Sequence, residues 1–331
     1  MRDLQRDPLR LGILGCGSFI QRRILPYLDE IDTVKITCLQ KRDIGEAEQV
    51  AKKYRVPHAV STREELLSHP DVEAVFIGTP NHMHENDAIA CAAAGKPTLC
   101  EKPLAPTGEA ALRIVEAFRK ANVPLFVGHA MRFKPSVLLA QKMLQEGALG
   151  KLLKIHAHFT ISLPKANWRF QKECGGGSMQ DLGVHLIDLI RFVTGQSIQS
   201  VFAVVDGEEV DRTVTAVGRL SGGATMSFES SFEHPFYSGF ELVGSESRLI
   251  SRNSLRQTFD AIETLEHLQA DGTVVSFPIK AHNIFVDELK HLAECIVNGA
   301  HSCLDGSNGV ENQKVVDAAY LSARSKQEVL V

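Results

Sequence analysis

Short apolar runs alternate with helical segments throughout the first 128 residues of the chain. The runs are LRLGILG, VKITCL, EAVFIGT, KPTLC and VPLFVG. Apolar runs of this kind are typical of strands buried on both faces, as in a parallel sheet covered by helices. Because each strand is followed by a helix, the connections are right-handed crossovers. We therefore expect a doubly wound α/β domain over residues 1–128.

The pattern changes in the remainder of the chain. The expected elements are a helix over about 135–147, a strand from Lys151, a glycine-rich helix over 175–195, six strand-like runs, and helices over about 284–298 and 308–325. This order predicts an α+β domain over residues 129–331, with a large, mainly antiparallel open sheet. A length of 331 residues agrees with two domains, since a single core rarely grows so large.

Charge and composition exclude several classes of partner. The formal net charge of −4 does not favour binding to nucleic acid or to a membrane surface. The start MRDLQRDPLR is too charged for a signal peptide, and no later apolar run reaches spanning length. The seven cysteines are scattered without a CxxC pair, so no disulfide framework is expected. We expect a soluble, cytoplasmic protein with reduced thiols.

The stretch LGILGCGSFIQRRILPYL is typical of a strand, a glycine turn and a helix. Gly15 and Gly17 supply the tight turn and the close backbone approach that a pyrophosphate needs, and the helix amino terminus attracts the anion. Ile20 replaces the third glycine of GxGxxG, a position that serves helix–strand packing and need not block a phosphate. The stretch favours a Rossmann-type dinucleotide site; the alternative is a plain strand-to-helix turn.

The second strand ends in TCLQKRD, at the position that selects the ribose of a dinucleotide. An NAD site usually has Asp or Glu here to bind the 2′-hydroxyl. Instead, Gln40, Lys41 and Arg42 come first, and Asp43 follows slightly late. Two cations can bind a 2′-phosphate, so we expect NADP to be preferred over NAD. The alternative is a solvated basic loop.

The apolar segment at 175–195 contains Asp181, His185 and Asp188. At about 100° per residue, His185 lies at about 40° and Asp188 at about −20° from Asp181 on a continuous α-helix. The three would form one polar stripe on a helix that is otherwise apolar and therefore buried. The stripe is either a buried salt-bridge or capping network or an acid/base site.

Three motifs together resemble the Gfo/Idh/MocA family of oxidoreductases. They are GTPNHMHENDA, TLCEKPLA and GGGSMQDLGVHLIDL, supported by NWRF and IFVDELKHLAECIVNG. Lys102 of the EKP motif precedes a proline, so it is held extended at the carboxyl end of a parallel strand, where ligands of such sheets bind. The similarity covers nearly the whole chain.

The resemblance implies hydride transfer between NAD(P) and a hydroxyl or carbonyl carbon, on a sugar, cyclitol or diol. It also implies that the open sheet serves oligomer contacts. Lys102 matches the family's EKP lysine, Asp181 and His185 match its DxGxHxxD pattern, and Pro80 and Asn81 match its loop near the nicotinamide. The residues expected to bind the cofactor are Gly15, Gly17, Ser18, Phe19, Ile20, Lys41, Arg42, Thr79, Pro80, Asn81, His84, Glu101 and Lys102.

The residue types fit this chemistry independently. Oxidation of a carbinol requires the hydroxyl proton to leave, and the imidazole of His185 is suited to accept it near neutrality. Asp181 can orient His185 and stabilise its charged form, and Lys102 can stabilise negative charge on the oxygen. Asp188 is expected to tie its helix to the surroundings rather than to take part in the reaction.

Other residues are weaker candidates. Arg132 could contact substrate, although it and His129 could equally serve at a domain hinge. Trp168 and Arg169 could line a sugar pocket, because aromatic faces and forked donors suit polyols and anions; the alternative is simple packing. No metal is expected, since hydride transfer needs none and the HMH of residues 82–84 has no diagnostic spacing.

Two further functions remain open at this point, namely a hydrolase or eliminase that uses tightly held NAD transiently, and a non-catalytic nucleotide sensor. The complete set of Lys102, Asp181 and His185 argues against a sensor. The unpartnered sheet of the second domain predicts a homodimer or homotetramer. Expected partners are small-molecule polyols, sugars or diols, with no nucleic acid and no membrane.

Overall fold

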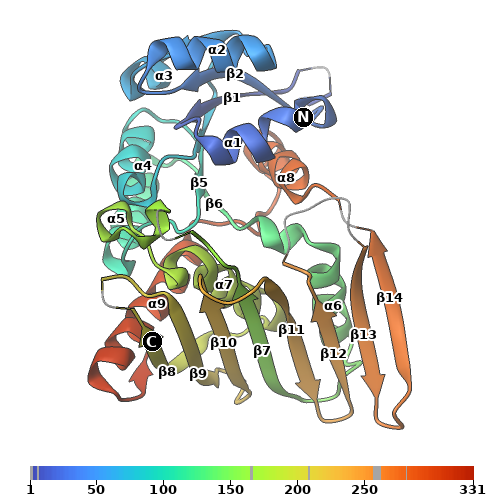
Figure 1. Ribbon diagram of the computed structural model, residues 1–331. Coiled ribbons are helices and arrows are strands. Elements are labelled where there is room, and N and C mark those ends of the chain that lie inside the picture. Colours follow the sequence, from blue (N-terminus) through green and yellow to red (C-terminus); the bar gives the residue numbers. More distant parts are fainter. Residues whose placement is uncertain (1–2, 6, 165–166, 208, 256–261, 281) are drawn as a thin grey trace. The chain divides into compact units, whose positions relative to one another are not determined.

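The computed structural model describes residues 3–5, 7–164, 167–207, 209–255, 262–280 and 282–331. The chain forms two compact units (Figure 1). The first consists of Met1–Gly128 and Phe285–Val310, and the second of His129–Ile284 and Glu311–Val331. Each unit is described by itself below.

The first unit contains a parallel sheet in which the described residues form six strands, in the order β3-β2-β1-β4-β5-β6. The strands are β1 (Leu9–Leu14), β2 (Val34–Gln40), β3 (His58–Val60), β4 (Ala74–Ile77), β5 (Thr98–Glu101) and β6 (Leu125–Gly128). Strands β1 and β4 are almost completely buried, as expected for the centre of a parallel sheet. The predicted doubly wound α/β architecture is confirmed.

The helices between these strands begin and end at residues suited to those positions. They are α1 (Ser18–Arg23), η1 (Leu25–Glu30), α2 (Ile44–Tyr54), α3 (Arg63–Ser68), η2 (Asn81–Met83), α4 (His84–Ala93) and α5 (Gly108–Ala121). Asp43, Thr62 and Thr107 each accept a backbone N–H at the start of a helix. Thr62 forms a complete capping box with Glu65. Local sequence therefore sets several of these helix boundaries.

Helix α8 (Ile284–Asn298) and the segment after it pack on the first sheet. Phe285 meets Phe19 edge to face, with ring centroids 5.3 Å apart. The N–H of Val127 donates to the carbonyl of Leu304 at 2.8 Å. Val310 belongs to the apolar core beneath the sheet. The sequence analysis placed residues 285–310 with the second domain, whereas these contacts join them to the first unit.

The second unit contains a larger sheet, in which the described residues form nine strands in the order β14-β13-β12-β11-β7-β10-β9-β8-β15. The strands are β7 (Leu152–Thr160), β8 (Ile198–Asp206), β9 (Thr213–Leu220), β10 (Thr225–Ser231), β11 (Tyr237–Gly244), β12 (Ser247–Arg252), β13 (Ile262–Gln269), β14 (Val274–Lys280) and β15 (Val329–Leu330). Among the described strands of this second sheet, β7 and β10 pair in parallel and every other pair is antiparallel. The predicted mainly antiparallel sheet is confirmed.

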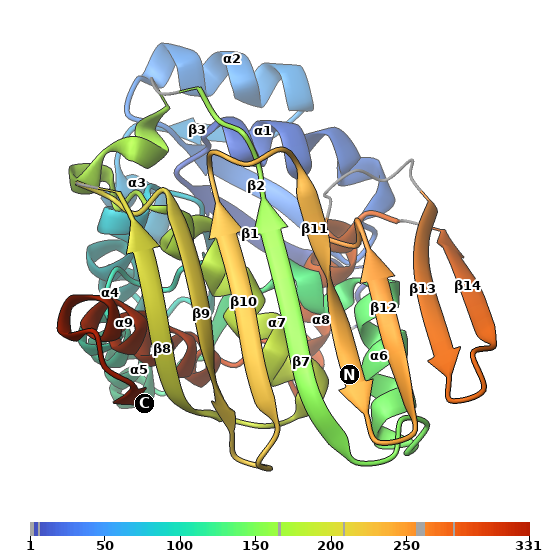
Figure 2. The same cartoon turned by 60° about the horizontal axis from the view of Figure 1, so that its bottom comes forward.

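The helices of the second unit lie against one face of this sheet, and Figure 2 shows α6 and α7 behind the strands. The helical elements are η3 (Ala130–Phe133), α6 (Pro135–Gln145), η4 (Trp168–Phe170), η5 (Lys172–Cys174), η6 (Met179–Gly183) and α7 (Val184–Thr194), while α9 (Ser307–Ser325) belongs to both units. On β7, Phe159 is buried toward α7, where it meets the ring of His185. The alternate residues His156 and His158 face the opposite, open side.

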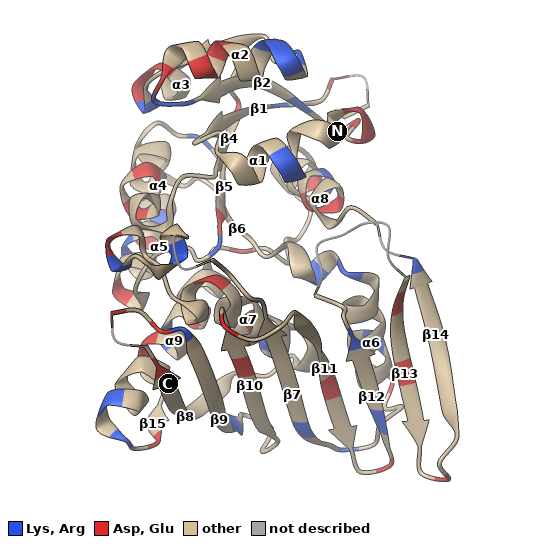
Figure 3. Ribbon diagram, in the orientation of Figure 1, with Lys and Arg blue, Asp and Glu red and all other residues tan. Residues whose placement is uncertain are grey.

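Acidic and basic side chains are interspersed along the helices and strands (Figure 3). Residues of both signs occur in both units. Among the residues that the structure describes, no helix combines the length and low polarity that crossing a bilayer requires.

Candidate active site

The turn after β1 requires glycine at its first position. Gly15 has φ +84°, in the left-handed region. A Cβ atom there would lie 2.7 Å from the backbone nitrogen of Thr79, which follows the neighbouring strand β4. The backbone N–H of Gly15 donates to Oε1 of Gln40 at 3.2 Å. The first turn is thus held against the ends of two adjacent strands.

Gly17 leaves room beside this turn. A Cβ at Gly17 would lie 4.0 Å from its nearest neighbour, the carbonyl oxygen of Gly15, so there is open space beside the turn. Gly17 is also the N-cap of α1 and, having no side chain, leaves the first N–H groups of the helix uncapped by its own residue. Open space beside the first N–H groups of a helix suits a phosphate, so the residues present fit a dinucleotide.

Ile20 has the packing role expected of the third glycine position. Its side chain is fully buried, and a Cβ at Gly78 would lie 3.0 Å from it. Phe19 packs on Phe285, as described above, while Ser18 is exposed. Of the residues that open α1, Ser18 and the backbone are thus better placed for a ligand than the side chains of Phe19 and Ile20.

The ribose-selecting position presents cations. Asp43 is engaged as the N-cap of α2, where it accepts the N–H of Glu46 at 2.8 Å. The side chain of Gln40 is buried and bridges Gly15 to the carbonyl of Ser61. Lys41 pairs with Glu46 at 3.0 Å and lies 3.5 Å from the carbonyl oxygen of Cys16 in the glycine turn. Arg42 is exposed.

The loop after β4 is tied down by buried hydrogen bonds. Thr79 donates through Oγ1 to Asp87 at 2.8 Å. His84 is fully buried, with Nε2 2.9 Å from the carbonyl oxygen of Thr79 and Nδ1 2.8 Å from that of Pro103. Burial lowers the pKa of His84, and the two carbonyls partly offset this effect. Pro80 is exposed and Asn81 is buried.

His84 therefore joins the loop after β4 to the residues that follow β5. A fully buried ring whose two nitrogens lie against backbone carbonyls faces the protein, so the structure favours a positioning role for His84 over the predicted contact with the cofactor. The nearby ammonium of Lys102 also contributes to lowering the His84 pKa, which places Lys102 close to the same loop. Lys102 follows the carboxyl end of β5, and its peptide bond to Pro103 is cis.

Glu101, just before Lys102, lies in a carboxylate-rich environment that the sequence analysis did not identify. Its carboxylate packs where a Cβ of Gly128 would be, and Oε2 accepts the N–H of Lys102 at 3.3 Å. Glu288 of α8 is completely buried; burial raises its pKa, and the charge of Glu101 raises it further. The signal that could have identified Glu288 from the sequence is its position among the apolar residues of the helix IFVDELKHL.

In the second unit, the segment at 175–195 is not one continuous α-helix. Met179–Gly183 form a π-helical turn, and α7 begins only at Val184. The angle calculated between Asp181 and His185 is therefore wrong, since a π-turn contains more residues than an α-turn. His185 and Asp188 do share α7, where Asp188 is three positions after His185 and therefore lies on the same face.

A buried carboxylate anchors the start of this segment. Asp211 accepts the N–H of Met179 at 2.6 Å and the hydroxyls of Ser178 and Tyr320 at 2.9 and 2.6 Å. Gly177 has φ +117°, and a Cβ there would lie 2.3 Å from a carboxylate oxygen of Asp211. Only glycine allows this approach. Sequence reasoning missed Asp211, which lies 32 positions after Met179 in the chain.

Asp181 and Arg169 are brought together. Nε of Arg169 donates to Oδ2 of Asp181 at 2.6 Å, and the guanidinium lies 4.7 Å from the ring centre of Trp168. Trp168 is 38% exposed, so one of its surfaces remains accessible. Asn167 caps this short turn through the N–H of Arg169. The predicted site residues Trp168, Arg169 and Asp181 thus form one cluster.

His185 is 5% exposed and tilts against Phe159, with ring centroids 6.2 Å apart. Its Nδ1 atom is buried. Asp188, one turn further along α7, accepts Nε and Nη2 of Arg132 at 2.8 and 2.5 Å and Nδ2 of Asn312 at 2.9 Å. Although burial alone would raise it, the charges of Arg132 and His129 hold the pKa of Asp188 well below its usual range.

Arg132 and His129 belong to this structural network. Nε2 of His129 bonds to Asn312 at 3.0 Å, and Arg132 is 5% exposed. The expectation that Asp188 ties its helix to the surroundings is confirmed. Nε and Nη2 of Arg132 are engaged by a buried carboxylate, so the structure favours a structural role for Arg132 over the contact with substrate.

The first unit gathers the glycine turn, the cationic loop and Lys102 at the carboxyl ends of the adjacent strands β1, β2, β4 and β5. A doubly wound sheet with this edge, joined in the chain to an open antiparallel sheet, is the architecture of a class of dinucleotide-dependent oxidoreductases. The chain belongs to the Gfo/Idh/MocA family. Residues 9–129 match the profile described as "Oxidoreductase family, NAD-binding Rossmann fold", and residues 137–250 match the GFO/IDH/MocA C-terminal domain.

Named relatives agree with this membership. The chain is 31% identical to 1,5-anhydro-D-fructose reductase of Ensifer adhaerens, over 91% of this chain and 92% of that protein. Levoglucosan dehydrogenase in complex with NADH and levoglucosan superposes with a TM-score of 0.89 at 25% identity, covering 98% and 100% of the two chains. A 3-ketoreductase of Actinomadura kijaniata with NADP and TDP-benzene gives 0.88 at 25% identity, covering 96% and 98%.

The protein is therefore an NAD(P)-dependent oxidoreductase that acts on CH–OH groups. The two alternatives raised from the sequence, a hydrolase or eliminase and a nucleotide sensor, receive no support from these relatives. The residues predicted to bind the nucleotide lie in the first unit, and Asp181 and His185 lie in the second.

Proposed function

We propose that this protein transfers hydride between NAD(P) and a hydroxyl-bearing or carbonyl carbon of a sugar, a related polyol or a diol. The observation that carries the proposal is the edge of the first sheet, where the glycine turn, the loop of Thr79 and Lys102 follow adjacent strands. The relatives that reduce anhydrofructose or oxidise levoglucosan support a carbohydrate as substrate.

The proposed chemical roles follow from residue types and burial. The bound nicotinamide supplies or accepts the hydride. We propose that His185 takes the hydroxyl proton through Nε2 during oxidation and returns it during reduction, since its Nδ1 is buried. Lys102 stabilises negative charge on the reacting oxygen. Asp181 supports the charged imidazole, and its ion pair with Arg169 holds its carboxylate in place.

For the cofactor, we propose a preference for NADP over NAD. An NAD site usually has an acid at the end of β2 that binds the ribose 2′-hydroxyl. Here Asp43 is engaged as a helix cap, and Gln40 uses its side chain to bridge two backbone groups. Lys41 and Arg42 offer positive charge for a 2′-phosphate. The two superposed relatives bind NADH and NADP respectively, so the choice rests on these residues of the chain itself.

For the substrate, we propose that the exposed surface of Trp168 packs against a sugar ring. Arg169 stacks on the same indole and is fixed by Asp181, so the aromatic group is held in a defined position before substrate arrives. Trp168 and Arg169 remain our candidates for substrate contacts, whereas Arg132 is withdrawn for the reason given above.

We also propose that the open face of the second sheet joins copies of the chain in a homodimer or homotetramer. Exposed apolar side chains on this face include Val204, Val217, Tyr237 and Ile262, with exposed fractions from 48% to 75%. A hollow of about 500 Å³ on the same face is lined by histidines and by Glu229, Glu241 and Arg252. Mixed charges and apolar groups on one face suit a self-complementary contact.

We place the protein in the cytoplasm, because all seven cysteines are free thiols in the structure, as a reducing compartment would maintain them.

The decisive experiment is a screen for cofactor consumption. NADP and NAD, oxidised and reduced, would be tested against aldoses, anhydrosugars, inositols and diols. We expect stoichiometric conversion of NADP with at least one carbohydrate, abolished in a His185→Asn variant that still binds cofactor. Absence of turnover with every hydroxyl and carbonyl compound, despite tight cofactor binding, would contradict the proposal.

A further inference from the structure

Two histidines and an aspartate converge in the first unit, apart from the nucleotide edge. His58 is the first residue of β3, His69 ends α3, and Asp71 lies in the turn before β4. His58 and Asp71 therefore lie toward the amino ends of parallel strands, whereas the glycine turn follows the carboxyl end of β1. The role proposed above for the first unit does not use this cluster.

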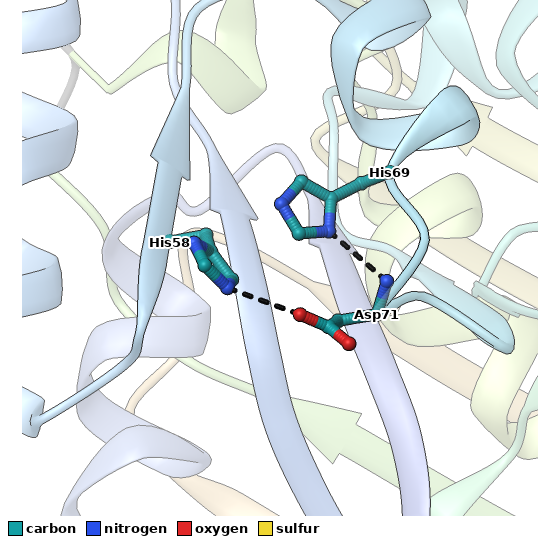
Figure 4. Close-up of side chains that lie close together, drawn as sticks. All are labelled: His58, His69 and Asp71. Carbon is teal, nitrogen blue, oxygen red and sulfur yellow. Dashed lines mark hydrogen bonds and ion pairs between the residues drawn. The ribbon is translucent and has the colours of Figure 1, made fainter.

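The three side chains offer one ligand atom each, and these atoms all lie within 4.8 Å of one another (Figure 4). Nε2 of His58 is 3.2 Å from Oδ2 of Asp71. Two ligands of a tetrahedral zinc ion, each about 2.0–2.2 Å from the metal, lie about 3.3 Å apart. The His58–Asp71 pair already has this separation, and the ligand atom of His69 lies within 4.8 Å of both partners.

The two imidazoles lie against each other, with ring centroids 4.3 Å apart and planes tilted by 42°. Nδ1 of His69 accepts the backbone N–H of Asp71 at 3.2 Å, a long hydrogen bond. An accepting nitrogen carries a lone pair and no proton, which is the state that a metal ligand needs. Nδ1 is therefore unprotonated, and a cation that binds there displaces its long hydrogen bond to the backbone.

Charged neighbours support the carboxylate. Nη1 of Arg10 donates to Oδ1 of Asp71 at 3.1 Å, and Nη2 pairs with Glu73 at 3.4 Å. Arg10 therefore occupies the oxygen of Asp71 that does not face His58, as outer hydrogen-bond partners of metal ligands do. Because one arginine offsets only one of two carboxylates, neutral histidines leave this group with a net charge of about −1, which favours a dication.

We propose that His58, His69 and Asp71 bind a divalent transition-metal ion, with Zn²⁺ as the preferred species. Imidazole and carboxylate ligands without a thiolate suit zinc and its neighbours, whereas Mg²⁺ prefers oxygen ligands alone. The ion fixes β3 to the turn before β4. Strand β3 has three residues and pairs with β2 alone in the described sheet, so a cross-link at its first residue stabilises an otherwise weakly held edge.

The test is zinc calorimetry on the full chain after treatment with a chelator. We expect one Zn²⁺ per chain and a rise in melting temperature on adding zinc, since an ion that binds only the folded state stabilises it. The His58→Ala and His69→Ala variants should each bind zinc about tenfold or more weakly. His267→Ala is the matched control, a half-buried histidine of the second unit bonded to a hydroxyl of Ser247. It should bind zinc as the unmodified protein does.

Zinc binding can be tested with the variants and also with the unmodified protein. His58 and Asp71 are 42% and 45% exposed, so their replacement should leave the metal-free melting temperature nearly unchanged. Should a variant fail to fold, Co²⁺ added to the unmodified protein gives a second measurement, because a tetrahedral site absorbs far more strongly in the visible range than the hydrated ion. The proposal is overturned if Co²⁺ keeps its hydrated spectrum, or if His58→Ala and His69→Ala bind zinc as tightly as His267→Ala.

Discussion

Replacing Glu288 with glutamine is expected to make the stability of this protein less dependent on pH above about pH 4.5. The side chain of Glu288 is 0% exposed on α8. Neither carboxyl oxygen has a hydrogen-bond partner in the part of the chain that the structure describes. Burial, and to a lesser extent the charge of Glu101, raises the pKa of Glu288 well above its usual value of 4.5.

The sign of the effect follows from proton counting. Between the unfolded pKa and the raised folded pKa, the folded chain holds a proton that the unfolded chain has released. The free energy of unfolding therefore falls as pH rises, by about 1.4 kcal/mol per pH unit for one proton. The stabilising contribution is fully present below the unfolded pKa and is lost by the time the pH passes the folded pKa. Because Glu101 interacts with Glu288, the folded pKa belongs to the pair.

Glutamine has nearly the same shape as a protonated glutamate but does not titrate. The Glu288→Gln variant should therefore lack this slope and should become more stable than the unmodified protein as pH rises. Urea unfolding followed by circular dichroism at half-unit steps from pH 5 to pH 8 measures the difference. Glu294→Gln, an exposed position on the same helix, is the control and should run parallel to the unmodified protein.

Parallel stability curves for Glu288→Gln and the unmodified protein would refute the reasoning. They would mean that Glu288 is ionised in the folded state and compensated by a partner or by water. A change in the urea dependence itself, rather than in the midpoint, would point instead to an altered unfolded or native state.

Three further predictions concern the proposed chemistry, cofactor and assembly. His185→Asn and Lys102→Met should each lower turnover by roughly 10²–10⁴-fold with near-native melting temperature and cofactor affinity; near-normal turnover would return both residues to a structural role. Arg42→Ala should weaken NADP more than NAD in calorimetry, and equal losses would remove Arg42 from the 2′-phosphate site. Val204→Lys, at a side chain 62% exposed on the open sheet, should lower the mass measured by light scattering, whereas Leu321→Lys, 47% exposed on α9, should not; equal masses would argue against the sheet interface.

The fold could be predicted because its signals are local. Apolar runs of strand length, separated by helical segments, indicated the parallel sheet, and Gly15 indicated the turn after β1. The assignment of α8 to the second domain failed for a reason of the opposite kind. The sequence predicts the apolar face of α8. The surface on which this face packs, which includes Phe19, is set by the three-dimensional fold.

The same division applies to the site. Residue types placed Asp181, Arg169 and Trp168 among the candidates, and the structure brings these three together. The roles of Gln40 and His84 were not predictable, because each bonds backbone groups on other strands or loops. The π-turn was equally hidden, and its first residue, Met179, bonds to Asp211, an acid distant in the chain.

Arg132 is where the interpretations from sequence and structure differ most, and they predict different behaviour. A substrate arginine is exposed to its ligand, and its loss raises KM. In the structure, Arg132 is buried and donates two hydrogen bonds to Asp188, whose other partners include Asn312. Removing one partner of a buried ion pair leaves a charge that the interior does not solvate, which costs about 3–5 kcal/mol.

Arg132→Met should therefore lower the free energy of unfolding by about 3–5 kcal/mol, while the folded fraction keeps a normal KM. Arg169→Met is the matched comparison, because the Arg169 and Asp181 side chains are 31% and 15% exposed and water screens their pairing more strongly. Its cost in stability should be smaller, and its KM should rise if Arg169 contacts substrate. Urea unfolding together with initial-rate kinetics on both variants separates the two roles. Native-like stability with a raised KM in Arg132→Met would restore Arg132 to the substrate site and make its bond to Asp188 incidental.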